Sequence, residues 1–434
     1  MKVHFIGIGG IGLSAIARFL NFSGHSISGS DIKESLLTNK LQAEGIKVIT
    51  PHHQDCIENQ DLVIYSAAVK QNNCELQMAR EKDLKIVSRK DALPLILSES
   101  KNYCVAGAHG KSTTTAILTA ILQNTALIGA ESKEFDSNFR FVDEKIVSFE
   151  ADESDGSFLN SNPYCAIVTN AEPEHMEHYG YDLDKFYGAY ESFLKLSKIR
   201  VINAEDEFMA TLEELDAIRL YPSKDIKNIT FGLKKDEPYT RFELKDLGEF
   251  EVYGFGFHIA LDASLAILAA LNEISLPKIK ENIKKYKGIK KRFDVLQKCD
   301  HFILIDDYAH HPTEVEATIK SVNLYQELSG IKESIAIWQP HKYSRTINNL
   351  EHFKRCFSGI DTLIILPVYS AGEEIQEIDF AKEFAFYNPL FATHIKSDNC
   401  KVEIYNNNTL IASLTNGIIC GFGAGDITYQ LRGK

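Results

Sequence analysis

Short apolar runs recur along the chain, and each ends in a loop rich in glycine or polar residues. The first three runs cover residues 3–8, 25–30 and 62–65. Their lengths and their β-branched and aromatic residues are typical of buried strands. Between the first two, the apolar residues Leu13, Ile16 and Leu20 follow helical spacing. This alternation predicts α/β domains with parallel sheets, whose ligands bind at the carboxyl ends of the strands.

The same pattern continues through the rest of the chain. Further strands are predicted at 103–106, 145–149, 166–169, 302–305, 335–338, 362–366 and 418–422. Helices are predicted over 182–200, 205–219 and 259–274, and alternating polar and apolar residues predict β-structure within 224–256. Catalytic and ligand-binding residues are therefore expected in the loops that follow the strands.

The first loop is a glycine turn, Gly7-x-Gly9-Gly10-x-Gly12, followed by a helix and a second strand that ends at Asp31. This is the nucleotide-binding βαβ fingerprint, in which the acidic residue accepts ribose hydroxyls. A tight turn without a ligand is the alternative. The region before the next glycine loop is short for a dinucleotide domain, so a nucleoside diphosphate fits better than NAD. The candidate contacts are Gly9, Gly10, Gly12, Asp31 and Ser66, the last at the end of the third strand.

The second glycine loop, residues 107–113, lies between a predicted strand and a predicted helix. Its backbone N–H groups can surround phosphate oxygens, Lys111 can reach the terminal phosphates, and the Ser112 hydroxyl can bind Mg²⁺. The usual phosphate loop has a further glycine where this chain has Val105. The loop therefore indicates ATP or GTP, with a chance glycine-rich turn as the alternative.

Acidic and histidine side chains follow the next two strands. Residues 150–155 contain four carboxylates, which favour Mg²⁺ binding, although a solvated charged surface is the alternative. His175 lies in the following loop and is a candidate metal or phosphate contact. In the last third, polar loops at 306–314, 339–346, 367–374 and 423–427 follow four more strands, and the basic 339–346 loop suits a carboxylate or phosphate.

Composition narrows the class of protein. A chain of 434 residues is long enough for two to four domains, and a net charge of −13 argues against a broad nucleic-acid or anionic-membrane surface. No apolar stretch approaches the ~18 residues of a membrane-spanning helix, and no signal-peptide pattern is present. The eight cysteines are dispersed without a Cys-x-x-Cys pair, which predicts reduced, mostly buried thiols in a cytosolic protein.

Taken together and in order, the motifs resemble those of the Mur ligases of bacterial peptidoglycan synthesis over essentially the whole chain. The resemblance rests on residues 4–10, 107–114, 150–155, 172–176, 292–293, 306–314, 339–341, 343–346 and 423–427. Mur ligases share the short phosphate loop, which accounts for Val105. The resemblance implies three α/β domains: a Rossmann-like N-terminal domain (1–98), a central P-loop ATPase with a mostly parallel sheet (99–294), and a Rossmann-like C-terminal domain (295–434).

The resemblance also implies a cytoplasmic, ATP- and Mg²⁺-dependent ligase. Its substrates are ATP, UDP-N-acetylmuramate, whose lactyl carboxylate is phosphorylated, and L-alanine, whose amine attacks the acyl phosphate. The N-terminal glycine turn then holds the UDP substrate. By their places in the motifs, ATP contacts are assigned to Gly107, Ala108, His109, Gly110, Lys111, Ser112, Thr113 and Asp306. Mg²⁺ ligands are assigned to Ser112, Glu150 and His175, with Glu153 as the alternative to Glu150. Catalysis is assigned to Lys111, Glu150, His175, His310 and Arg345, and amino-acid binding to His311, Lys342 and Arg345.

The chain departs from the family pattern at several of these positions. Ala108 and Ser112 stand where the family usually has threonines, and Ile259 and Asp262 replace two amides of the adenine-contacting segment. Lys342 replaces an arginine in the amino-acid site. Tyr190 lies roughly where some relatives place a carbamoylated lysine, so the ligands of a second Mg²⁺ stay unassigned.

Three alternative functions stay open. The first is the family's recycling ligase, which attaches a preformed tripeptide, although Tyr308 and Glu314 fit the alanine activity better. The second is an NAD-dependent oxidoreductase built on Gly7–Gly12, and the third is a catalytically inactive regulatory or scaffold protein. A homo-oligomer is compatible with the sequence, which does not indicate the oligomeric state.

Overall fold

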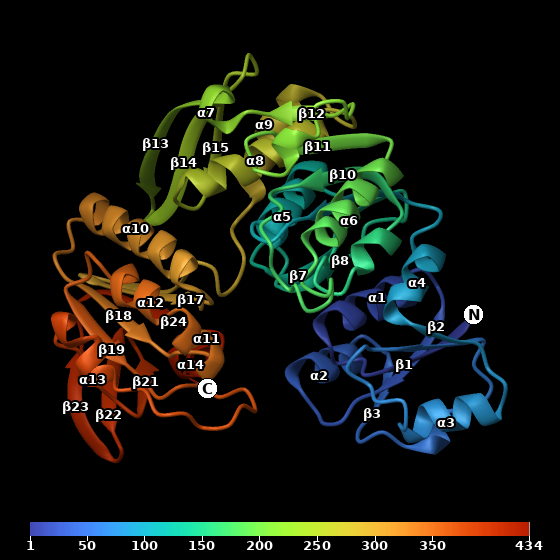
Figure 1. The fold of residues 1–434 in the computed structure, drawn as a ribbon, viewed down its shortest axis with the longest axis horizontal. Coiled ribbons are helices and arrows are strands. Elements are labelled where there is room, and N and C mark those ends of the chain that lie inside the picture. The colour runs from blue at the N-terminus through green and yellow to red at the C-terminus, as the bar shows by residue number, and fades with distance from the viewer. Residues whose placement is uncertain (434) are drawn as a thin grey trace. The chain divides into compact units, whose positions relative to one another are not determined.

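The computed structural model describes residues 1–433 and divides into two compact units. The first unit consists of residues 1–229, 241–252 and 258–287, and the second of 230–240, 253–257 and 288–434. Figure 1 colours the chain from blue at the N-terminus to red at the C-terminus. Within 1–433, none of the helices has the length and apolar character needed to cross a bilayer.

The first unit begins with a five-stranded parallel sheet in the order β3-β2-β1-β4-β5. Because β1 lies between β2 and β4, the loops after these strands meet at the point where the strand order reverses, the usual ligand crevice of such sheets. The strands are β1 (Lys2–Ile6), β2 (Ser26–Ser30), β3 (Lys47–Ile49), β4 (Leu62–Tyr65) and β5 (Ile86–Ser88). The helices are α1 (Ile11–Phe22), α2 (Leu36–Ala43), α3 (Cys74–Glu81) and α4 (Arg89–Ile96).

The second sheet of this unit has seven strands in the order β12-β11-β10-β6-β9-β7-β8 and is parallel except for the β7–β8 pair. Since β6 lies between β9 and β10, the phosphate loop lies beside both loops with acidic residues. The strands are β6 (Lys101–Ala106), β7 (Thr125–Ser132), β8 (Ser137–Arg140), β9 (Ile146–Glu150), β10 (Pro163–Val168), β11 (Ile199–Asn203) and β12 (Ile218–Leu220). The helices are α5 (Lys111–Leu122), α6 (Leu183–Leu196), α7 (Pro222–Asp225), α8 (Phe257–Ala270) and α9 (Leu276–Asn282).

The β7–β8 hairpin joins the two sheets of the first unit. Arg18 of α1 donates to Ser137 Oγ (2.6 Å), and its guanidinium lies 4.8 Å from the centre of the Phe139 ring. The Asn138 side chain donates to the carbonyl oxygen of Ile11 (2.8 Å), which lies within the N-terminal glycine turn. The glycine turn and the phosphate-loop sheet are therefore held together by buried contacts.

A three-stranded sheet confirms the β-structure predicted within 224–256 and contains residues of both units. Its strands are β13 (Ile226–Lys234), β14 (Glu237–Leu244) and β15 (Glu249–Tyr253). The second unit is built on a six-stranded sheet in the order β16-β17-β24-β18-β19-β20, in which only the β16–β17 pair is antiparallel. Its strands are β16 (Asp294–Cys299), β17 (Phe302–Asp307), β18 (Ser334–Trp338), β19 (Thr362–Ile365), β20 (Leu390–Phe391) and β24 (Gly417–Phe422).

The helices of the second unit are α10 (Pro312–Ser329), α11 (Tyr343–Asn348), α12 (Leu350–Cys356), α13 (Phe380–Glu383) and α14 (Ile427–Leu431). The unit also contains a small antiparallel sheet of β21 (His394–Asp398), β22 (Lys401–Asn406) and β23 (Thr409–Leu414). Trp338 is fully buried and packs against Phe353, Phe357 and Phe384. These contacts place the core of this unit on the face of β18.

The predicted helix over 205–219 is wrong. That segment contains a single 3-10 turn, Met209–Thr211, and then enters strand β12. The Asp206 side chain accepts hydrogen bonds from the backbone N–H groups of Phe208 and Met209 and from that of Ala171 in a neighbouring loop, so it stabilises a turn. The end of the other predicted helix, 182–200, is also wrong because Ile199 begins the buried strand β11.

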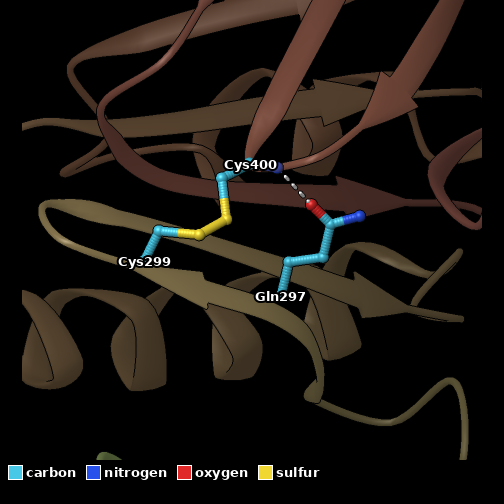
Figure 2. Close-up of a disulfide and its surroundings, with 3 residues drawn as sticks. All are labelled: Gln297, Cys299 and Cys400. Carbon is cyan, nitrogen blue, oxygen red and sulfur yellow. Dashed lines mark hydrogen bonds between the residues drawn. A yellow bond between two sulfur atoms is a disulfide. The ribbon is translucent and has the colours of Figure 1, made fainter.

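Cys299 and Cys400 form a disulfide, which corrects the prediction that all eight cysteines are reduced thiols (Figure 2). Their Cα atoms are 6.2 Å apart, and the bridge joins the end of β16 to the turn between β21 and β22. The backbone N–H of Cys400 also donates to Gln297 Oε1 (2.9 Å). The other six cysteines are free, and all of them except Cys74 are buried, as predicted.

We expect the disulfide to stabilise the chain by about 2–4 kcal/mol, because it closes a long loop in the unfolded chain. Urea unfolding with and without a thiol reductant measures this difference. Cys299→Ser should remove the effect of the reductant, whereas the exposed Cys74→Ser should retain it. Equal unfolding midpoints for the oxidised and reduced wild-type chain would contradict the expectation.

Candidate active site

The phosphate loop connects the buried strand β6 to helix α5. Gly107 has φ +140°, and a Cβ atom there would overlap Thr169 Oγ1 and lie 2.9 Å from the carbonyl oxygen of Asn170. Gly110 caps α5 with φ +82°, and a Cβ there would lie 2.5 Å from Asp262 Oδ1. Both positions therefore require glycine, for backbone conformation and for space.

The end of β10 holds the phosphate loop in shape. Thr169 Oγ1 donates to the carbonyl oxygen of His109 (2.6 Å), and the His109 N–H donates to Asn170 Oδ1 (3.1 Å). The Asn170 side chain also donates to the His109 carbonyl oxygen (3.0 Å). Thr169 and Asn170 lie at the end of a predicted strand but are not among the predicted site residues. A small polar pair beside a glycine loop was the available signal.

Lys111 is the first residue of α5, and its ammonium group lies over the loop. It donates to Glu153 Oε1 (2.7 Å) and to the carbonyl oxygens of Gly107 and Ala108. Glu153 is 1% exposed, and its other oxygen has no hydrogen-bond partner among residues 1–433. Burial raises the pKa of Glu153, and the Lys111 charge opposes that shift. The loop thus places one cation at its centre, with a buried carboxylate beside it.

Two of the four predicted metal ligands are in contact. Ser112 Oγ donates to Glu150 Oε1 (3.0 Å), and Glu150 Oε2 accepts from the N–H of Gly129 (2.7 Å). Glu153 is instead paired with Lys111, and His175 is exposed, with φ +52°. Among residues 1–433, no group of three or more histidine, cysteine, aspartate or glutamate side chains is arranged to hold a metal.

Tyr190, at the position of the carbamoylated lysine of some relatives, is fully buried in an aromatic cluster with Phe158 and Phe186. Burial raises the pKa of its hydroxyl well above the ordinary value. This packing leaves the residue unsuited to binding a metal.

A cavity of about 230 Å³ lies between the N-terminal glycine turn and the phosphate loop. Its lining includes Gly12, Arg89, Lys111, Glu150 and Asp152. Burial works to raise the pKa of Asp152, but hydrogen bonds from Ser154 and the Arg89 charge lower it. Arg89 is not among the predicted site residues, because only the fold brings the end of β5 to this cavity.

The predicted UDP contacts lie together at the crevice of the N-terminal sheet. The Gly9 N–H donates to Asp31 Oδ2 (2.7 Å), so the carboxylate lies against the glycine turn. A Cβ at Gly7 would lie 3.1 Å from the Cβ of Ser66, which places the end of β4 on the other side of that turn. The fold therefore brings the glycine turn, Asp31 and Ser66 together.

The two residues that depart from the family's adenine segment lie on α8. Asp262 is 4% exposed and faces Gly110, and Ile259 is also buried. A carboxylate here accepts hydrogen bonds but, unlike an amide, donates none when ionised. The departure thus lies directly against the phosphate loop.

In the second unit, the position of Asp306 argues against the predicted contact with ATP. Its side chain is fully buried, and Oδ2 accepts from Thr428 Oγ1 (2.6 Å) and from Arg432 Nη2 (2.8 Å). Arg432 also pairs with Asp294 (2.6 Å). These bonds hold Asp306 in the packing between β17, β16 and α14.

Histidine and arginine side chains from two loops of the second unit form a cluster. His310 Nδ1 lies 3.0 Å from the carbonyl oxygen of Tyr308 and 3.4 Å from Glu314, and its ring contacts that of His341. Arg345 Nη1 lies 3.0 Å from His341 Nδ1. Burial lowers the pKa of His310, which favours a neutral imidazole. His341 belongs to one of the motifs that resemble the family but is not among the predicted site residues.

The remaining predicted amino-acid contacts lie at the edges of this cluster. His311 precedes α10, where its N–H donates to Glu314 Oε2 (3.2 Å) and its ring lies 3.1 Å from Thr313 Oγ1. Lys342 has φ +68°, and its N–H donates to the carbonyl oxygen of Tyr369 (2.8 Å). His311 thus contributes to the start of the helix, and Lys342 to the turn before α11.

His341 should make stability depend on pH. Burial, followed by the Arg345 charge, lowers the pKa of His341 to about 4, whereas a histidine in the unfolded chain has a pKa of ~6.5. Between these values the unfolded chain binds more protons than the folded chain, so stability falls as the pH drops from 6.5 towards 4. We expect His341→Asn to reduce this dependence in urea unfolding across that range, and the exposed His352→Asn to leave it unchanged. An identical pH profile for His341→Asn and wild type would contradict the assignment.

Three family models match successive parts of the chain. Residues 2–101 match "Mur ligase family, catalytic domain", residues 105–260 match "Mur ligase middle domain", and residues 291–398 match "Mur ligase, glutamate ligase domain". The boundaries between these matches fall near the boundaries between the sheets.

Full-length relatives and solved structures are also similar to this chain. The UDP-N-acetylmuramate–L-alanine ligase of Campylobacter curvus is 57% identical, with coverage of 100% of this chain and 99% of the relative. The enzyme of the same name from Helicobacter pylori is 53% identical, with coverage of 100% and 96%. The crystal structure of the UDP-N-acetylmuramate–alanine ligase of Thermotoga maritima superposes with a TM-score of 0.79 at 26% identity, covering 100% of this chain and 97% of that one.

Proposed function

The chain belongs to the Mur ligase family, and we propose that it joins L-alanine to the lactyl carboxylate of UDP-N-acetylmuramate with ATP as the phosphoryl donor. The observation that carries the proposal is the cavity between the glycine turn and Lys111, where a UDP-linked acid can meet a terminal phosphate. Support for L-alanine as the amino acid comes from full-length relatives that carry this activity in their names. The place of action is then a step of peptidoglycan precursor synthesis in the cytoplasm, where ATP is available.

Each region has its own part in this proposal. Residues 1–98 bind the UDP substrate through Gly9, Gly10, Gly12, Asp31 and Ser66. Residues 99–294 bind ATP through the phosphate loop, from Gly107 to Thr113. Residues 295–434 bind the amino acid through Lys342 and Arg345, with His311 at the edge of the site.

The reaction has two steps. A carboxylate oxygen of the UDP substrate attacks the γ-phosphorus of ATP, which forms an acyl phosphate and releases ADP. Because two anions must approach each other, the Lys111 ammonium offsets their repulsion and stabilises the transferring phosphoryl group. The amine of L-alanine then attacks the acyl carbon, which forms the amide and releases inorganic phosphate. His310, neutral because burial lowers its pKa, can accept the proton of the amine.

The residues beside the phosphate loop suit Mg²⁺. The hydroxyl of Ser112 and the carboxylate of Glu150 are hard oxygen donors in hydrogen-bond contact. The second oxygen of the buried Glu153 has no hydrogen-bond partner in the part of the chain that the structure describes. We assign Ser112 and Glu150 as ligands, with Glu153 and His175 as further candidates. When bound, Mg²⁺ supplies positive charge that neutralises the phosphate oxygens.

Phosphate release with UDP-N-acetylmuramate, ATP and different acceptors tests the proposal. We expect turnover with L-alanine, weaker turnover with glycine and L-serine, and none with the tripeptide. Activity with the tripeptide alone would instead assign the chain to the recycling reaction. Binding of NAD without binding of the UDP sugar would exclude the ligase altogether.

A further inference from the structure

Arg89 lies at the ligand crevice of the N-terminal sheet without belonging to its glycine turn. It is the first residue of α4, directly after β5, so it projects from the carboxyl end of a parallel strand. A Cβ atom at Gly12 would lie 3.3 Å from Cζ, Nε and Nη2 of Arg89. The guanidinium therefore lies against the last glycine of the turn.

The partners of Arg89 come from the acidic loop after β9. Its Nη1 atom is 3.8 Å from Asp155 Oδ2 and 4.0 Å from Asp152 Oδ2, which are ion-pair distances but too long for hydrogen bonds. Its Nε atom is buried and has no hydrogen-bond partner within the described chain. The guanidinium is thus held by charge, and its buried Nε–H has no acceptor among the described residues.

The residues that line the cavity indicate which kind of ligand group the Arg89 guanidinium can bind. Arg89 and Lys111 are its two cationic lining residues, one from each sheet of the first unit. Glu150, a proposed Mg²⁺ ligand, and Gly12 also line it. An acid that accepts a phosphoryl group from ATP beside Lys111 must place its carboxylate in this space.

We propose that Arg89 binds the lactyl carboxylate of the UDP-linked sugar acid and so selects that sugar over one without a carboxylate. This proposal rests on the proposed function. A guanidinium can donate two parallel hydrogen bonds to one carboxylate, which a lysine ammonium cannot reproduce. The substrate carboxylate would accept direct hydrogen bonds from the guanidinium, and the longer ion-pair contacts with Asp152 and Asp155 would keep the guanidinium oriented.

Calorimetric binding of two ligands separates carboxylate recognition from other effects. UDP-N-acetylmuramate carries the lactyl carboxylate, and UDP-N-acetylglucosamine carries the same nucleotide and amino sugar without it. For wild type we expect tighter binding of the first ligand. In Arg89→Ala that ligand should bind on the order of 10- to 100-fold more weakly, as expected for losing hydrogen bonds to a charged group, with little change for the second.

Two further variants keep the test independent of folding. Arg89→Lys retains the charge and should lose part of the preference, and the neighbouring Lys90→Ala should retain all of it. In steady-state kinetics Arg89→Ala should raise the KM for UDP-N-acetylmuramate and leave the KM for L-alanine unchanged.

The outcomes distinguish this inference from the proposed function. Equal weakening of both ligands in Arg89→Ala would assign Arg89 to the diphosphate or to structure and would overturn the proposal. An Arg89→Ala variant that still turns over L-alanine and still prefers UDP-N-acetylmuramate over UDP-N-acetylglucosamine would also overturn the proposal for Arg89. The ligase assignment would then stand. A wild-type chain that binds neither UDP sugar would overturn both.

Discussion

Replacement of Lys111 by alanine is expected to lower kcat on the order of 10³-fold, the scale of losing one preorganised charge at a reacting group. Lys111 is the cation at the centre of the phosphate loop, within 2.7 Å of Glu153. The UDP substrate should still bind, because its contacts are proposed on the N-terminal sheet. Phosphate release and calorimetry with UDP-N-acetylmuramate measure the two effects separately.

A structural cost of the Lys111 substitution must be separated from the catalytic one. Removing the ammonium leaves the buried Glu153 carboxylate without its cation, which costs about 3–5 kcal/mol when a buried pair is broken. The double variant Lys111→Ala/Glu153→Gln removes that charge, so it should regain stability in urea unfolding while staying inactive. Near-normal turnover in Lys111→Ala would refute the role of the lysine.

Gly107→Ala is expected to destabilise the chain by roughly 2–5 kcal/mol and to abolish ATP binding, since it adds both backbone strain and overlap. The backbone φ of +140° disfavours any side chain, and the added methyl would collide with Thr169 at the end of β10. That collision would disrupt the hydrogen bonds that join His109 to Thr169 and Asn170 at the strand end. Urea unfolding and calorimetric titration with an ATP analogue measure both effects.

Gly188→Ala is the matched control. Gly188 lies within α6, and a Cβ atom there has no neighbour within 4 Å. Alanine has the higher helix propensity, so this variant should be as stable as wild type or up to ~1 kcal/mol more stable. Equal stability of the Gly107 and Gly188 variants would contradict the account of the loop.

The parts of the fold that apolar runs encode were predictable from the sequence. Strand β4 lies at the predicted residues, and β6, β9 and β17 begin or end within a few residues of them. Buried parallel strands are continuous apolar runs, so their position and the loops after them can be identified without the fold. The same reasoning placed the phosphate loop and the glycine turn at strand ends.

The errors have physical causes. The segment at 205–219 has helical spacing, but the Asp206 side chain stabilises a turn. Residues 218–220 then pair with β11 as an edge strand of the sheet. Short strands such as β3 and β5 carry too few residues for a periodic signal. The pairing of Cys299 with Cys400, 101 residues apart, depends on tertiary structure alone.

The types of residue in the candidate site could be predicted from the sequence, but the contacts between their side chains could not. Glycines, Lys111, Ser112 and Glu150 stand out because phosphate and Mg²⁺ chemistry demands them at strand ends. The sequence does not indicate that Glu153 pairs with Lys111, or that Asp306 is held by Arg432 in the packing of the sheet. These partners are distant in sequence, so only the fold determines which carboxylate is structural and which faces the cavity.

In the proposed reaction the chain activates a carboxylate by phosphorylation before it forms the amide. UDP-N-acetylmuramate labelled with ¹⁸O in both lactyl carboxylate oxygens, incubated with ATP and L-alanine, tests this directly by mass spectrometry of the released phosphate. We expect one ¹⁸O atom in each phosphate released, because the bridging oxygen of the acyl phosphate leaves with the phosphoryl group. Formation of the alanyl product with unlabelled phosphate would contradict this expectation.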